Sequence, residues 1–200
     1  MGNSEQAATR PSWLARRRAE RARERTARRL YLAVVARARR TEPYARFGVP
    51  DTPDGRFEML GLECALLLRR LRALGTEGEA VGQSLLEVMV TDLDRNLREM
   101  GVGDLSVGRY VRRMTSSLLA RAAALDAALA SGDGEALAAH LGRALYADGP
   151  PPSSAQLRAL ADAVVRAAIA LDGVPGERLL AGELDSGAAE KAVDPSAAEP

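Results

Sequence analysis

Apolar residues recur at spacings of three and four along most of this chain, which is the period of a helix with one buried face. The first such run predicts a helix over residues 13–40. Its apolar face holds Leu30, Tyr31, Val34, Val35 and Ala38. Pro43 ends this helix, because proline disfavours helical geometry in the residue before it.

Two longer apolar stripes follow. Residues 56–74 form a second helix, and a third starts at Thr76, where Thr76 and Glu79 have the spacing of a capping box. Gly101 and Gly103 end the third helix. The apolar faces expected for the two helices are Phe57, Leu60, Cys64, Leu67, Leu68, Leu71 and Leu74, and Val81, Leu85, Val88, Met89, Leu93, Leu97 and Met100.

The second half of the chain continues the helical pattern. A fourth helix is expected from a cap at Ser106 to Ala130, and a short fifth helix from a cap at Asp133 to Tyr146. Ser153 and Gln156 again have capping-box spacing, ahead of a sixth helix over 155–171. The fourth helix has an apolar face of Val107, Val111, Met114, Leu118, Ala122, Leu125 and Leu129. No run alternates as a strand would, so the sequence predicts an all-α bundle of about six helices.

The remaining segments are expected to be loops or tails. Tyr44–Gly55 holds prolines and glycines and predicts a structured loop, in which Asp51 or Asp54 caps the second helix. Residues 148–154 predict another loop. A flexible leader over 1–12, a helical domain over 13–173 and a disordered acidic tail over 174–200 complete the prediction, because small and acidic residues bury too little apolar surface to fold alone.

Charge is distributed unevenly along a chain whose formal net charge is only +1. Residues 1–40 contain 12 arginines against 3 glutamates, whereas residues 41–174 and 175–200 are both mildly acidic. The basic first helix predicts a contact with an anionic surface, or with the acidic parts of the same chain. The arginines expected to make that contact are Arg16, Arg17, Arg18, Arg21 and Arg25.

Catalytic and metal-binding chemistry has little support. Cys64 is the only cysteine and His140 the only histidine, which argues against a zinc site or a thiol–imidazole pair, and we expect both in ordinary core or surface positions. Asp92 and Asp94 point about 200° apart on a helix, so salt bridges with neighbouring arginines are the simpler interpretation. We expect no enzyme activity, no metal and no cofactor.

Nucleotide and membrane-spanning functions are also disfavoured. Glycines near Asp104 resemble a phosphate cradle only loosely, since no P-loop or dinucleotide pattern is present. No apolar run is long enough to cross a membrane, and no secretory signal is recognisable. The interpretation is a cytoplasmic protein, with peripheral contact at the inner membrane allowed. Arg109, Arg112 and Arg113 cluster near the start of a helix, where the helix dipole disfavours cations.

Two segments carry a more specific signal. The first motif, Phe47–Phe57, reads FGVPDTPDGRF, and the second motif, Asp92–Val107, reads DLDRNLREMGVGDLSV. In order and content they resemble the ubiquinol–cytochrome c chaperone family, the assembly factors of respiratory complex III. The resemblance extends from about residue 31 to residue 147. It departs from the family pattern at Arg109, where lysine is more frequent.

This resemblance implies a compact helical bundle that binds newly made cytochrome b until haem and partner subunits join. It also implies a ribosome contact near the exit tunnel and a small helical co-chaperone, as in mitochondrial relatives. The residues expected to bind the partner are Phe47, Pro50, Asp51, Asp54, Gly55, Asp92, Arg95, Asp104, Arg109 and Arg112. The alternative is a ribosome- or RNA-associated factor that acts through the Arg-rich helix, although few aromatic residues are available to stack on bases.

Overall fold

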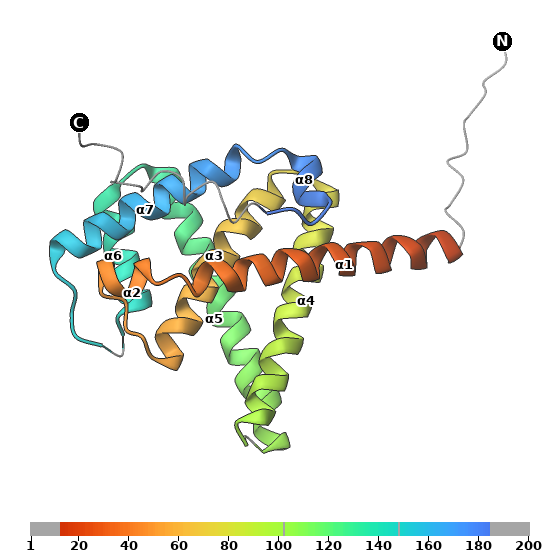
Figure 1. The fold of residues 1–200 in the computed structure, drawn as a ribbon, viewed down its shortest axis with the longest axis horizontal. Coiled ribbons are helices and arrows are strands. Elements are labelled where there is room, and N and C mark those ends of the chain that lie inside the picture. Colours follow the sequence, from red (N-terminus) through yellow and green to blue (C-terminus); the bar gives the residue numbers. More distant parts are fainter. Residues whose placement is uncertain (1–12, 102, 148, 185–200) are drawn as a thin grey trace, which may run out of the picture.

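The computed structural model describes residues 13–101, 103–147 and 149–184, and every regular element there is helical, as the apolar spacing predicts (Figure 1). The helices are α1 (Trp13–Ala38), α2 (Glu42–Phe47), α3 (Pro53–Arg72), α4 (Thr76–Glu99), α5 (Asp104–Ser131), α6 (Gly134–Leu145), α7 (Ser154–Asp172) and α8 (Gly176–Leu180).

Helix α3 lies at the centre of the bundle. It contacts α1, α4, α5, α6 and α7. Every residue from Cys64 to Leu68 is buried, so this stretch is covered on all sides and not only on one stripe. The other helices pack their apolar stripes around it, and the described residues include no buried charged side chain.

Two predicted helix caps are confirmed. The Ser153 hydroxyl accepts a hydrogen bond from the Gln156 amide at 3.2 Å, and the Gln156 side chain accepts one from the Ser153 amide at 2.9 Å. At the start of α6, Asp133 accepts from the amides of Glu135 and Ala136. Both arrangements satisfy backbone donors that a helix start leaves unpaired.

Three other expected caps are wrong. Thr52, and not Asp51 or Asp54, caps α3, and its hydroxyl accepts from the Gly55 amide at 3.1 Å. Helix α3 therefore starts at Pro53, because proline is favoured in a first turn where its missing N–H needs no partner. Glycines occupy the N-cap positions of α4 and α5, so Thr76 is already helical and Ser106 lies inside the first turn of α5.

Two short helices were not predicted. Helix α2 occupies the start of the segment expected to be a loop; Pro43 sits in its first turn, and Gly48, with φ at +73°, ends it. Helix α8 falls within the segment expected to be a disordered tail. Its Leu179 is fully buried, and Leu184 beyond it is also buried, so residues 174–184 belong to the folded domain. The predicted leader 1–12 and residues 185–200 lie outside the described residues.

Two parts of the fold project from the bundle (Figure 1). The ends of α4 and α5 form an arm with its own small core of Leu97, Val107 and Val111. At its end Met100, which the spacing places on an inner face, is 70% exposed, since no helix covers the last turn of α4 there. The first half of α1, residues 13–25, is exposed throughout and extends away from the other helices.

Candidate functional site

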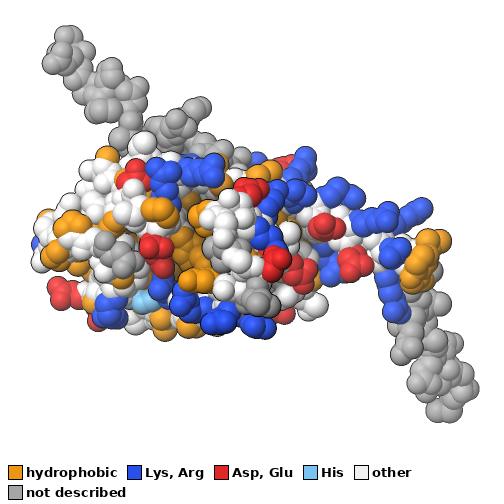
Figure 2. Space-filling model, turned by 90° about the horizontal axis from the view of Figure 1, so that it is seen from below, with side chains coloured by type: hydrophobic (Ala, Val, Ile, Leu, Met, Phe, Trp, Pro, Cys, Tyr) orange, Lys and Arg blue, Asp and Glu red, His pale blue; other side chains and the backbone are white. Residues whose placement is uncertain are grey.

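An apolar groove lies between α3, α5 and α6, and Figure 2 shows a hollow lined by hydrophobic side chains on the face seen from below. Its apolar lining includes Phe57, Leu62, Leu118, Leu141 and Leu145. The free volume is only about 30 Å³, room for a side chain's tip and not for a helix. A partner can therefore pack across the rim of this groove but cannot insert a helix into it unless α3, α5 and α6 separate.

Polar groups border the groove on one side. The guanidinium of Arg121 in α5 forms an ion pair with the carboxylate of Glu58 in α3 across its edge. Both residues also line an adjoining cavity whose wall includes Pro50, Asp54 and Gly55 of the first motif. The apolar surface and the predicted loop residues are thus continuous, with an ion pair at their boundary.

His140 of α6 lines the same groove and is half-buried. Burial lowers the pKa of its imidazole, and the positive charges of Arg143 and Arg121 lower that pKa further. The neutral ring is therefore favoured around neutral pH, which keeps this part of the groove uncharged apart from the Glu58–Arg121 pair.

The first motif builds the loop between α2 and α3. Phe47 is buried, and its carbonyl accepts a hydrogen bond from the Tyr146 hydroxyl at 2.8 Å. Burial raises the pKa of Tyr146 to about 12, so this donor keeps its proton. A Cβ at Gly55 would lie 2.0 Å from the Pro50 carbonyl oxygen, so only glycine fits there. Most of this motif is thus needed to form the loop itself.

The exposed end of the loop carries the charges. Arg56 donates two hydrogen bonds to Asp51, at 2.6 and 3.2 Å. These bonds lower the pKa of the Asp51 carboxyl, which stays ionised at neutral pH. Asp54 is exposed in the first turn of α3, where the helix dipole favours an acid. Among the residues described, no hydrogen bond or ion pair involves the Asp54 side chain.

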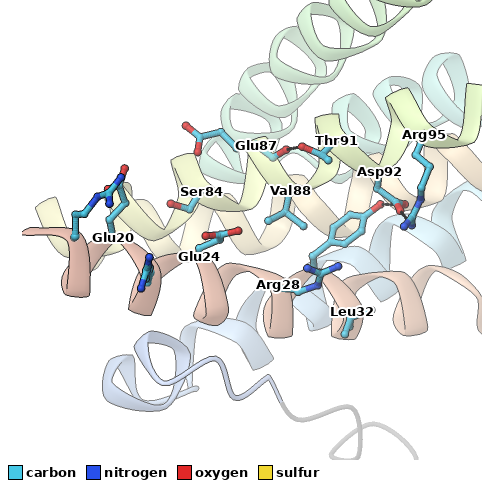
Figure 3. Close-up of a pocket in the computed structure, with 13 residues that line it drawn as sticks. Glu20, Glu24, Arg28, Leu32, Ser84, Glu87, Val88, Thr91, Asp92 and Arg95 are labelled. Carbon is cyan, nitrogen blue, oxygen red and sulfur yellow. Dashed lines mark hydrogen bonds and ion pairs between the residues drawn. The ribbon is translucent and has the colours of Figure 1, made fainter. Parts of the chain in front are cut away.

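Asp92 and Arg95 lie at a different place, on the side of α4 that faces α1 (Figure 3). The Tyr31 hydroxyl donates to Asp92 at 2.8 Å, and Arg95 donates to the same carboxylate at 2.6 Å. Burial and the Asp92 carboxylate both raise the pKa of Tyr31. Asn96 also donates to Asp92, as helical spacing predicts. Asp92 therefore joins α1 to α4.

A second groove of about 510 Å³ runs between α1 and α4 beside this junction. Both acidic and basic side chains line it, among them Glu20, Glu24, Arg28 and Glu87, which Figure 3 labels. Charges of both signs cancel at short range, so the lining selects no single class of charged ligand.

The second motif forms the turn at the end of the arm. Arg98 pairs with Asp94 at 2.7 Å, the helical neighbour pair that the sequence predicts, and also with Asp104 at the start of α5. Gly101 adopts a φ of +82°, which other residues rarely take. Met100 has no such role, and its exposed apolar side chain is a candidate for partner contact that the spacing analysis, which placed it on an inner face, missed.

Eight of the ten predicted partner-binding residues are therefore divided among three places: the loop beside the apolar groove, the α1–α4 junction and the end of the arm. Arg109 and Arg112 are exposed on α5. On an ideal helix they lie about 180° and 120° from Leu118, away from the groove. The arginines predicted for an electrostatic contact all lie on the exposed first half of α1.

The remaining chemical candidates occupy structural positions. Cys64 is fully buried, its thiol lies 3.8 Å from the Met89 sulfur, and burial raises its pKa to about 12. Across the described ranges, no cluster of His, Cys, Asp and Glu is arranged to hold a metal ion. A helix long and apolar enough to span a membrane is likewise not found among them.

A helical bundle with an apolar groove that is bordered by an ion pair is typical of a protein-binding module. A family model described as ubiquinol-cytochrome C chaperone matches residues 45–186. A crystal structure described as that of the Cbp3 homolog from Brucella abortus matches with a TM-score of 0.73 and 34% identity, covering 84% of this chain and 92% of that chain. A search of curated proteins found no match.

The chain belongs to the ubiquinol-cytochrome c chaperone family. The matched residues include both motifs and extend through α8, which confirms the resemblance identified from the motifs and agrees with the packing of Leu179. Membership places the protein among the assembly chaperones of complex III, and it implies an assembly factor that is not an enzyme. The whole of α1 precedes the matched residues.

Proposed function

We propose that this chaperone binds newly made cytochrome b and holds it during assembly of the ubiquinol–cytochrome c reductase, with the groove between α3, α5 and α6 as its main contact surface. The family carries the assembly function. The observation that supports the site is the continuity of an apolar surface with a charged loop built by the first motif.

The chemistry of the client fits such a surface. A newly made polytopic membrane protein presents apolar helices that are flanked by charged and polar residues. Leu62 and Phe57 offer partly open apolar contact, and Asp54 with the Glu58–Arg121 pair offers charges beside it. Interfaces of this kind combine an apolar centre with a polar rim. Asp51 of the same loop remains a proposed contact beside this centre, whereas Asp104, Arg109 and Arg112 lie away from the groove and remain proposed contacts of a separate surface.

A substitution inside the groove tests the site. In Leu62→Gln a polar amide replaces part of the apolar lining, while the half-open position allows the fold to persist. Recovery of cytochrome b with the tagged chaperone should fall about tenfold, which corresponds to roughly 1.4 kcal/mol of lost apolar contact. The measurement is co-purification from respiring membranes, with circular dichroism as the test of folding.

Leu119→Gln is the matched control. Leu119 is 46% exposed on α5 but does not line the groove, so this variant should recover cytochrome b as the native chain does. Equal recovery by both variants would move the client site away from the groove. Absence of cytochrome b from the native preparation would contradict the proposed client itself.

The alternative of a ribosome or RNA partner is not favoured by the groove, and neither it nor a small helical co-chaperone has an observation in its support here. The ribosome, RNA and the co-chaperone stay predictions.

A further inference from the structure

A regular stripe of side chains follows α1 from residue 14 to residue 32, on the side opposite the buried Ala27 and Leu30. Its members are separated by four, three, four, three and four residues, so they share one helix face. They are Leu14, Arg18, Arg21, Arg25, Arg28 and Leu32, and all six are exposed. This basic stripe is bracketed by leucines that are 61% and 62% exposed.

The acidic residues of the same segment, Glu20 and Glu24, lie beside the stripe and do not belong to it. They line the groove toward α4, which Arg21, Arg28 and Leu32 of the stripe also border (Figure 3). No ion pair or hydrogen bond among the described residues involves the guanidinium of Arg18, Arg21, Arg25 or Arg28. The charges of the stripe itself are therefore all of one sign and form no ion pair within the described structure, although Glu20 and Glu24 lie beside them.

The bundle holds the stripe in a fixed orientation. Ala27 and Leu30 are fully buried against the core. Beside them, the Thr26 hydroxyl donates to the Leu180 carbonyl at 3.1 Å, and Arg29 donates to the Ala181 carbonyl at 3.4 Å. The end of α8 thus braces α1 where it leaves the bundle. The exposed segment beyond this point extends outward (Figure 1), and Figure 2 shows basic side chains along it with acidic ones between them.

We propose that this stripe is a docking surface for an anionic lipid bilayer. Four guanidinium groups in a row match anionic headgroups, and exposed leucines at both ends can enter the boundary between headgroups and acyl chains. Trp13, 66% exposed at the start of the helix, suits the same interface. The leucines argue against RNA, because a phosphate backbone offers no apolar region to bury them.

Binding of the purified protein to lipid vesicles tests this proposal without any client. The native chain should co-sediment with phosphatidylcholine vesicles that contain phosphatidylglycerol, and not with phosphatidylcholine alone; rising salt should release it. The triple variant Arg18→Gln, Arg21→Gln, Arg25→Gln should bind about 100-fold more weakly. Because Trp13 is the only tryptophan, its emission should shift to the blue when the native chain binds.

A second triple variant serves as the matched control. Arg143→Gln, Arg158→Gln, Arg166→Gln removes the same charge from exposed positions on α6 and α7, and its vesicle binding should stay within about twofold of native. An equal loss of vesicle binding in both variants would show that net charge, and not the stripe, controls binding, and would overturn the proposal. Tighter binding to a single-stranded RNA oligonucleotide than to the vesicles, or vesicle binding without a blue shift, would overturn the proposal. Because no client is present in this experiment, none of these outcomes decides whether the protein captures cytochrome b.

Discussion

At the residue scale, the polar side chains of the two motifs serve mainly to shape the backbone. Thr52 caps α3, Arg98 ties α4 to Asp104, and Asp92 receives the Tyr31 hydroxyl from α1. Each role satisfies a donor or a charge that would otherwise be unpaired. Residues without such a role, Asp54 and Met100, are therefore better candidates for direct contact with a partner.

Tyr31→Phe tests the structural role of Asp92. The variant removes a hydrogen bond to a carboxylate in a partly buried site, so the free energy of unfolding should fall by about 1–2 kcal/mol. Urea titration measures this loss. Tyr110→Phe is the control, since Tyr110 is 42% exposed, and its unfolding free energy should change by less than about 0.5 kcal/mol. Equal stability of the two variants would contradict a structural role for Asp92 and favour a role in binding the client.

At the element scale, the arm differs from the rest of the bundle. Its buried core of Leu97, Val107 and Val111 forms a cluster distinct from the main one, which includes Leu85 of the same helix α4, and the half-buried Met114 packs against both. A small core gives a low local free energy of opening, whereas the main cluster opens only with the whole domain. The end of the arm should thus open locally more easily than the main bundle does.

Leu97→Ala should loosen the arm without unfolding the domain. The lost packing of about 2 kcal/mol should speed amide exchange roughly 30-fold across residues 97–111. Exchange in the buried part of α3 should stay unchanged in hydrogen-exchange mass spectrometry. Leu85→Ala, in the main core, should instead raise exchange throughout the bundle. Uniform acceleration by Leu97→Ala would show that the arm and the bundle open together.

At the scale of the whole molecule, the last described residues pack back against helices from the first half of the chain. Arg70 of α3 donates to the carbonyls of Leu171 and Val174, which directs the chain after α7 toward α8. Helix α8 then packs near α4 and braces α1. The proposed lipid contact on α1 and the proposed client groove are thereby parts of one connected bundle.

Leu179→Ala tests this closure. Leu179 is fully buried, so the free energy of unfolding should fall by about 2–5 kcal/mol. Thermal or urea unfolding measures the effect, and Ile169→Ala, at a position that is 65% exposed on α7, should change stability by less than about 0.5 kcal/mol. If the Leu179→Ala variant is as stable as the control, residues 174–184 do not contribute to the stability of the folded domain.

Local signals account for what the sequence predicted well. The six long helices follow from spacing, and the caps at Asp133 and Ser153 follow from side chains that reach their own backbone. The pairing of Arg98 with Asp94 is also local, one helical turn apart. The short helix α8 was missed because five residues carry too little periodicity, and its stability comes from Leu179 entering a core made elsewhere.

By itself, then, the sequence determined the all-α class, most helix ranges and, through its two motifs, the family. Only the tertiary structure decided that Tyr146 holds Phe47, that Tyr31 meets Asp92 and that Thr26 meets Leu180. It also divided most of the predicted contact residues among three places and brought Leu62, Leu118 and Leu141 together in one groove. The physical reason is that apolar spacing records which face of a helix is buried, but not which other helix buries it.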